Sequence, residues 1–301
     1  MSPSRLSEVA RGIGALLALA SCWYIGQKLW AVLSAPEYLG LTWPSTTRFL
    51  AAWVSCSLAI ALLSCGWFLV VRASGAKIAF APAFLGYALS QPAKYLPGNL
   101  LHFAARHAYG RADGHSHGGL LVASVLEAGL LVMLALLLAI LFSPLPAELA
   151  VHRLSLLVVV VLSGLLALMV ARRRWPGRAS WSIGYGACGL GYFLFSTLAF
   201  ALLAVDLLDA IVPGHLLGAV ALSWIGGFLV IGAPGGIGVR EALLLQFLNG
   251  TANDAELLAL VISFRIVLVA ADFTLFAIAW MWQRSASQPA RRNATAQSDR
   301  D

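Results

Sequence analysis

The chain has 301 residues, of which 60% are hydrophobic and only 11% charged, and its formal net charge is +7. An average soluble domain carries about a quarter charged residues, so this sequence cannot cover a water-soluble fold with polar side chains. The basic residues flank apolar segments instead of forming a patch interleaved with aromatic residues, which argues against a nucleic-acid partner. The composition therefore predicts an integral membrane protein.

Long apolar runs predict an all-α fold, a polytopic bundle of transmembrane helices. A helix needs about 20 apolar residues to cross about 30 Å of hydrocarbon. The first such run follows basic residues as a secretory signal would, but it is too long for one, so we expect a retained span. In chain order the six expected spans are residues 12–33, 49–71, 118–142, 150–171, 182–205 and 256–282.

Two further segments, residues 79–111 and 215–249, combine an apolar arm with a shorter amphipathic arm. The arms meet at Pro97 and Pro234, each followed by glycine. Proline interrupts the helix because it lacks a backbone donor, and glycine permits the turn that results. Because the second arms are too short to cross a bilayer, we predict two re-entrant helical hairpins.

The charged residues between these segments predict the orientation of the chain. In this layout Arg48 is the one basic residue on the outer side, where Glu37, Glu148, Asp206 and Asp254 also fall. An excess of lysine and arginine on the inner side is typical of cytoplasmic connections. We therefore expect a multi-pass protein of the prokaryotic cytoplasmic membrane with both termini in the cytoplasm.

The same arrangement of elements occurs twice. Residues 12–142 and 150–282 each contain three spans and one hairpin, and the two hairpins open to opposite sides. This is the inverted-repeat plan of many transporters. We predict one transmembrane domain over residues 1–282, followed by a polar tail at 283–301 that is expected to be disordered.

The second hairpin contains the strongest candidate site. Gly235, Gly236 and Gly238 leave the amides of Gly236, Ile237 and Gly238 exposed at a helix start, where anions bind. Arg240 adds a planar donor fork suited to phosphate. A lipid phosphate is the ligand that this combination favours. The alternative is that the glycines only allow close helix packing and that Arg240 extends to the membrane surface.

The first hairpin contains a matching set of polar residues. Lys94 precedes its turn, and Asn99, His102 and Arg106 follow at a spacing that places the three on one helix face. That face could bind a headgroup from the other leaflet. The alternative is an interfacial helix that lies on anionic lipid.

Glu127 and Arg265 are the most deeply placed charges of the spans that follow the two hairpins. A lone buried charge is costly, so we expect a cross-repeat ion pair, either a gate or a static lock, with Glu241 in the same set. Asp272 is an alternative partner for Arg265, because it lies seven residues later on the same helix face.

The remaining polar residues give little sign of catalysis. His115 and His117 lie in a glycine-rich loop without a third ligand at suitable spacing, which is weak support for a metal site. No Ser-His-Asp order, pair of catalytic carboxylates or P-loop occurs. We expect no catalytic residue, no cofactor and no enzymatic activity.

Taken together, these motifs resemble the transmembrane region of lysylphosphatidylglycerol synthases and the wider set of flippase-like membrane proteins. The resemblance extends over about residues 5–282, and the Pro-Gly-Gly-x-Gly-x-Arg-Glu element is its most specific part. It depends on Lys94-Tyr-Leu-Pro-Gly98, Arg106, Glu127, Pro234-Gly-Gly-Ile-Gly-Val-Arg240-Glu241 and Arg265.

In the full-length synthases this region resembles a lipid flippase, and a separate soluble domain performs the aminoacylation. Only the short tail follows the last span here, so the resemblance implies lipid translocation and not synthesis. The expected cargo is an anionic phospholipid or a polyprenyl-linked or isoprenoid-linked lipid. A second hypothesis is a non-transporting partner that anchors an envelope glycosyltransferase or a lipid-modifying enzyme.

Overall fold

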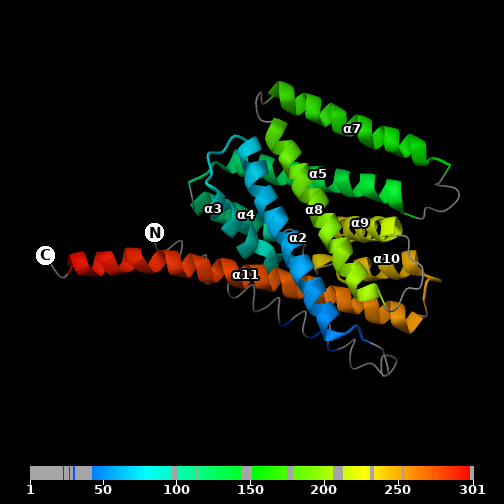
Figure 1. Cartoon of the computed structure of the whole chain (residues 1–301). Helices are drawn as coiled ribbons and strands as arrows, with labels where there is room; N and C mark the ends of the chain where they lie inside the picture. The colour runs from blue at the N-terminus through cyan, green and yellow to red at the C-terminus, as the bar shows by residue number, and fades with distance from the viewer. Residues whose placement is uncertain are drawn as a thin grey trace.

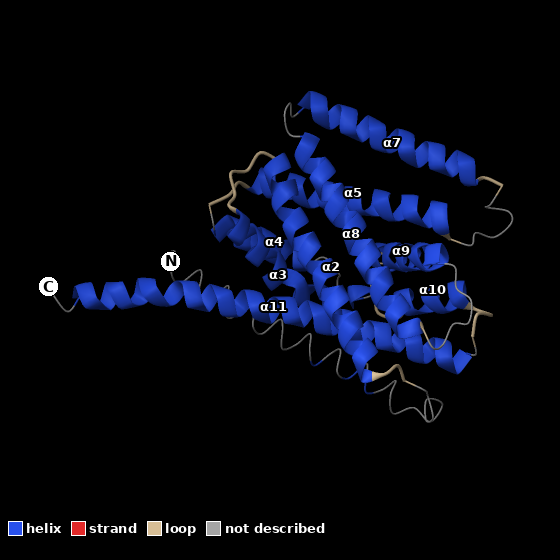
Figure 2. Cartoon of the chain, viewed as in Figure 1, coloured by secondary structure: helices blue, strands red, loops and turns tan. Residues whose placement is uncertain are grey.

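The protein is a bundle of helices, and no strand occurs among the residues that the structure describes (Figure 2). The structure is a computed structural model. It describes residues 43–96, 101–112, 114–143, 151–174, 179–205, 213–230, 234–252 and 254–298, together with residues 23, 27 and 30.

The described helices follow one another with short connections. They are α2 (Thr46–Ala73), α3 (Phe80–Ser90), the 3-10 helix η2 (Gln91–Tyr95), α4 (Leu101–Ala112), α5 (His117–Phe142), α7 (Arg153–Arg174), α8 (Ala179–Ala204), α9 (Pro213–Leu229), the 3-10 helix η3 (Pro234–Gly236), α10 (Val239–Leu248) and α11 (Asp254–Ser298).

Four of these helices are long and apolar enough to cross a membrane, namely α2, α5, α8 and α11. They coincide with four of the six spans that the sequence predicts. The predicted span at 150–171 corresponds to α7, whose apolar part, Arg153–Leu166, is shorter. The predicted span at 12–33 lies outside the described residues, apart from residues 23, 27 and 30.

The helices form a row that two others cross. Successive neighbours α7, α5, α9, α10 and α11 contact one another in that order, and α2 and α8 pack together across the row (Figure 1). Helix α2 contacts α8 more extensively than any other element, and it also contacts α11 and α5. The pair α2 and α8 therefore holds the two ends of the row together.

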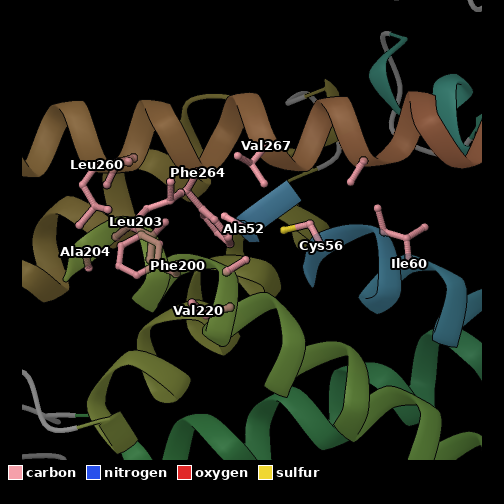
Figure 3. Packing of buried hydrophobic residues seen from close by; sticks show 14 of the residues in the cluster. Ala52, Cys56, Ile60, Phe200, Leu203, Ala204, Val220, Leu260, Phe264 and Val267 are labelled. Atoms are coloured by element: carbon pink, nitrogen blue, oxygen red, sulfur yellow. The ribbon is translucent and has the colours of Figure 1, made fainter. Parts of the chain in front are cut away.

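Close packing of aromatic and small side chains joins α2, α8 and α11 (Figure 3). Ala52 and Cys56 of α2 are fully buried there, and Phe200 of α8 meets Phe264 of α11 edge to face, with ring centroids 5.0 Å apart. Helix association inside a membrane depends on such van der Waals contacts, because lipid tails are as apolar as the side chains.

Each predicted hairpin contains a pair of packed helices with a 3-10 segment between them, and the predicted turn of the first hairpin, at residues 97–98, lies outside the described residues. Helix α3 packs on α4 and α9 on α10, and the two 3-10 segments η2 and η3 contact each other. In η2, Pro92 lies at the start of the segment, where its lack of an N–H costs nothing. In η3, Gly235 and Gly236 have φ of 58° and 74°, which other residues adopt only with strain. The two 3-10 segments, called here the turns of the two hairpins, therefore meet inside the bundle.

The end of α11 covers most of the segment for which the sequence predicts a polar, disordered tail. Helix α11 continues to Ser298 and projects beyond the other helices (Figure 1). Alanine, arginine and glutamine, which are common in this stretch, are good helix formers. Extending an existing helix also avoids the cost of nucleation.

Replacing Gly218 with alanine is expected to destabilise the packing of α9 on α5. A Cβ at this position would lie 2.4 Å from the backbone nitrogen of Ser143, which cannot move aside as a side chain can. Overpacking of this kind costs about 1–3 kcal/mol. Gly186→Ala is the matched control, because a Cβ there meets nothing within 4 Å. Thermal unfolding in detergent should show a lower midpoint for Gly218→Ala alone, and equal midpoints would contradict the expectation.

Candidate functional site

Seven charged side chains lie inside the bundle around three adjoining cavities. We call them the charged cluster. They come from both hairpins and from the two spans that follow the hairpins. Its members are Lys94 of η2, Arg106 of α4, Glu127 of α5, Arg240 and Glu241 of α10, and Arg265 and Asp272 of α11.

A buried ion pair joins the second arm of the first hairpin to α5. Arg106 Nη1 donates to Glu127 Oε2 at 2.6 Å, and both side chains are almost fully buried. The guanidinium also lies over the rings of Tyr87, Trp67 and Phe103, at 4.3, 4.6 and 5.0 Å from their centroids. Aromatic faces attract cations most strongly where water is excluded. Arg106 is therefore held in place by one carboxylate and three aromatic rings.

A second tie joins the turn of the first hairpin to α11. Lys94 Nζ lies 2.6 Å from Asp272 Oδ2, and the Tyr95 hydroxyl donates a short hydrogen bond to the same oxygen. Lys94 also donates to Gln91 Oε1 at 3.2 Å. The Asp272 side chain is only 1% exposed, and its other oxygen, Oδ1, has no hydrogen-bond partner. One carboxylate oxygen thus receives both donors while the second remains unused.

A third set of contacts joins the second hairpin to α11. Arg265 Nη1 lies 3.4 Å from Glu241 Oε1, and Arg265 Nη2 donates to the carbonyl oxygen of Gly235 at 3.0 Å. The other Glu241 oxygen accepts from the amide of Gly238 at 2.6 Å, which caps the start of α10. Arg265 also lies 5.6 Å from the centre of the Tyr95 ring, so the two hairpin turns meet at this arginine.

Arg240 differs from the other three cations of the charged cluster. In the part of the chain that the structure describes, no carboxylate lies within 4 Å of it, and its buried Nε has no hydrogen-bond partner. Gly227 and Gly236 leave room for its side chain, because a Cβ on either would lie within 2.7 Å of an Arg240 atom. The cluster therefore has four cations and three carboxylates, and Arg240 is the cation that has no carboxylate partner.

Three cavities meet at Arg240 and Tyr192, which line all of them. The largest contains about 670 Å³, including its open mouth, and the others about 360 and 270 Å³. Charged residues line the largest cavity together with apolar side chains, namely Ile60, Leu63, Phe103, Leu131, Trp224 and Phe228. The lining of this space is therefore amphipathic.

The predicted cross-repeat pair between Glu127 and Arg265 is not formed. Glu127 pairs with Arg106 and Arg265 with Glu241, and Asp272, the alternative partner for Arg265, pairs with Lys94. In each pair the acid and the cation come from two elements that pack against each other. These elements are α5 and α4 for Glu127, α11 and η2 for Asp272, and α10 and α11 for Glu241. The deep charges are paired as expected, but Arg106–Glu127 and Arg265–Glu241 each lie within one repeat, and Lys94–Asp272 is the pair that joins the two repeats.

Two of the backbone amides that were predicted to be free for an anion already donate hydrogen bonds within the protein. The amide of Ile237 donates to Pro234 O at 3.1 Å, and the amide of Gly238 donates to Glu241. These two amides are used within the turn and are not available to an anion. The glycines at 235 and 236 instead permit the left-handed backbone and the close approach of Tyr95 and Arg240.

The other predicted ligands fall in the same place. Lys94, His102, Arg106 and Arg240 all line the largest cavity, as expected for the two hairpins. Asn99 lies outside the described residues. Sequence reasoning missed Tyr95 and Tyr192. Tyr95 lies inside the Lys-Tyr-x-Pro-Gly motif, which is a usable signal, whereas Tyr192 belongs to no motif.

Comparison with known proteins adds no family to this picture. A search of protein-family profiles and a search of curated proteins both found no match to this chain.

Two histidines meet near the exposed end of α4. His107 Nε2 lies 2.7 Å from His117 Nδ1, and the rings are stacked. Within the described ranges, no three histidine, cysteine or acidic residues gather as a metal site would require. Partial burial, together with His117 and Arg111, lowers the pKa of His107. The contact links α4 to the start of α5.

Acidification is expected to weaken this link. Because the pKa of His107 is lower in the folded protein, the unfolded chain binds more protons near pH 6.5, and stability is lost as pH falls through that value. Thermal midpoints measured from about pH 7.5 to about pH 5.5 should fall less in His107→Gln than in the wild type. Identical slopes for the two proteins would contradict this assignment.

Removing the partner of Arg106 is expected to be strongly destabilising. Glu127→Gln leaves a buried guanidinium without its counter-charge, which costs about 3–5 kcal/mol. The double variant Arg106→Gln with Glu127→Gln removes both charges and should recover much of that loss. Denaturant unfolding in detergent measures both. A double variant as unstable as Glu127→Gln would show that the cost does not come from the unpaired charge.

Proposed function

We propose that this chain is a lipid translocator that moves an anionic lipid between the leaflets of the membrane. The observation that carries the proposal is Arg240, a cation without a carboxylate partner in the described cluster, at the meeting point of three cavities. Its cargo would be an anionic phospholipid or a polyprenyl-linked lipid, and its location the prokaryotic cytoplasmic membrane.

The electrostatics of the charged cluster favour an anionic ligand. An uncompensated charge away from water costs several kcal/mol, and a bound anion removes that cost. Arginine presents a planar set of donors that matches the oxygens of a phosphate. Because the cluster has one cation more than it has carboxylates, one negative charge brings it to neutrality.

The lining of the largest cavity favours a lipid over a small soluble anion. A soluble phosphate would need polar groups on all sides, but much of this cavity is aliphatic or aromatic. Trp224 and Phe228, which both line this cavity, stack with ring centroids 5.0 Å apart. A phosphate at Arg240 would leave the attached hydrocarbon facing these rings, which suits an amphiphile.

The two hairpins offer a means to change which leaflet the site faces. In many transporters, interrupted helices from two inverted repeats meet near the midplane, and one repeat rocks against the other. Here the 3-10 segments η2 and η3 contact each other, and Gly235 of η3 lines two cavities together with Arg240. The Lys94–Asp272 ion pair joins η2 to α11, and the hydrogen bond from Arg265 to the Gly235 carbonyl joins η3 to α11. In this proposal the turns rearrange around a bound headgroup, and the pairs Lys94–Asp272 and Arg265–Glu241 re-form when it leaves.

Arg240→Ala is expected to reduce lipid exchange at least about tenfold, which corresponds to 1.4 kcal/mol of lost headgroup binding. The measurement is leaflet exchange of fluorescent phosphatidylglycerol, and separately of polyprenyl phosphate, in proteoliposomes with purified protein. Arg111→Ala is the matched control, because it removes an exposed arginine outside the cavities and should exchange lipid as the wild type does.

Three outcomes decide between the hypotheses. Exchange by the wild type that is lost in Arg240→Ala supports the translocator and its headgroup site. Exchange that is retained in Arg240→Ala would contradict the assigned site. Wild-type protein that exchanges neither lipid faster than empty liposomes would contradict the translocator and favour a membrane partner that anchors an envelope enzyme.

A further inference from the structure

Asp272 has an arrangement that the proposed headgroup site does not explain. Its carboxylate is 1% exposed and lines the smallest of the three cavities, together with Lys94, Arg240 and Arg265. Oδ2 accepts from both Lys94 and Tyr95, while Oδ1 is buried and has no hydrogen-bond partner. One oxygen of a deeply buried acid is thus left without a donor beside a space that a ligand could enter.

Lys94, the cation that compensates Asp272, is also the most exposed of the paired cations. Its side chain is 26% exposed, against 8% for Arg265 and 1% for Arg106. Lys94 and Arg240 line the same two cavities, and a lysine side chain is long and flexible. A phosphate bound at Arg240 that carries a second negative charge would therefore recruit Lys94 before any other cation of the cluster.

The charge balance then distinguishes two kinds of phosphate. The cluster has four cations and three carboxylates, so a singly charged phosphodiester neutralises it and leaves Lys94 with Asp272. A doubly charged phosphomonoester would leave one negative charge in excess. With Lys94 drawn to the phosphate, Asp272 would keep only the Tyr95 hydroxyl, and a buried carboxylate without a cation takes up a proton.

Asp272 is the acid that would accept this proton, because the other two acids of the cluster keep their cations. Glu127 retains Arg106, and Glu241 retains Arg265 and the Gly238 amide. Arg240 would be occupied by the phosphate itself. The titratable and charged groups that face Asp272 are Lys94 and Tyr95 of η2, Cys56 of α2, Tyr87 of α3, Tyr192 of α8, Arg240 of α10 and Arg265 on its own helix.

We propose that Asp272 is a proton site that adapts the cluster to the charge of its ligand. A phosphodiester lipid binds without a proton, and a phosphomonoester lipid binds together with one proton on Asp272. The proton comes from bulk water through the open cavity, and Lys94 stays charged as it moves from the carboxylate to the phosphate. This inference rests on the headgroup site at Arg240 and adds that a lipid phosphomonoester would cross the membrane with a proton.

Titration calorimetry in buffers of different ionisation enthalpy measures the protons taken up on binding. The probes are short-chain phosphatidylglycerol, a phosphodiester, and short-chain phosphatidate, a phosphomonoester, at about pH 8, where the latter is doubly charged. We expect about one proton for phosphatidate and none for phosphatidylglycerol. As pH rises further, phosphatidate affinity should fall by up to about tenfold per unit, whereas phosphatidylglycerol affinity should not change.

Asp272→Asn should bind both lipids without proton uptake, with pH-independent affinity for phosphatidate. Lys94→Gln combined with Asp272→Asn removes both partners and guards against a fold defect from one unpaired group. It should also take up no proton. Glu256→Gln, an acid on the same helix outside the cluster, is the matched control and should behave as the wild type does.

Equal proton uptake for the two lipids in the wild type would overturn this inference, as would proton uptake that persists in Asp272→Asn. Binding with the expected proton counts but without leaflet exchange would contradict only the translocator. If neither probe binds, the headgroup site is overturned and this inference with it.

Discussion

Burial of charge decides how the two hairpins are held in this bundle. A charge removed from water needs a partner within a few ångströms, so each buried acid fixes the element that brings its cation. Glu127 holds α4 through Arg106, Asp272 holds η2 through Lys94, and Glu241 and Arg265 join α10 to α11. The long helices pack through apolar side chains that many sequences could supply. The hairpins depend on three particular ion pairs.

This constraint also separates two arginines that the sequence treats alike. Both Arg106 and Arg240 follow a turn and were expected to bind a headgroup. Arg106 is enclosed by a carboxylate and three aromatic rings, so drawing it to a ligand would break every one of those contacts. Arg240 has no carboxylate among the described residues and opens onto all three cavities. The first is a structural cation, and the second is the cation whose charge no carboxylate of the described cluster compensates.

Much of the architecture could be predicted from the sequence, because helix length and proline and glycine positions are local properties. The long spans, the two hairpin segments and the depth of Glu127 and Arg265 follow from such signals. The ion-pair partners could not be predicted, because they depend on which helices become neighbours. Glu127 lies beside Arg106 only because α4 packs on α5, and no spacing in the chain encodes that contact. The same applies to Asp272 and Lys94.

The amide prediction failed for a different reason. Exposed amides at a helix start attract anions, but the nearest anion can belong to the protein. Glu241 lies three residues after Gly238 and takes its amide, which is the ordinary helix-capping spacing. The glycine-rich motif therefore has a conformational role, since it lets the chain turn and lets aromatic and guanidinium groups approach the backbone.

The contact between the two turns affects whether ions can leak through the site across the membrane. Gly235 passes so close to Tyr95 that a Cβ there would lie 2.5 Å from a ring carbon, and the same tyrosine is hydrogen-bonded to Asp272. Neither turn can retreat without losing contact with the other or pulling on α11. In a translocator, such interlocking would prevent the two sides of the site from opening at once. A cell membrane that stores energy as an ion gradient could then contain this protein without leaking current through it.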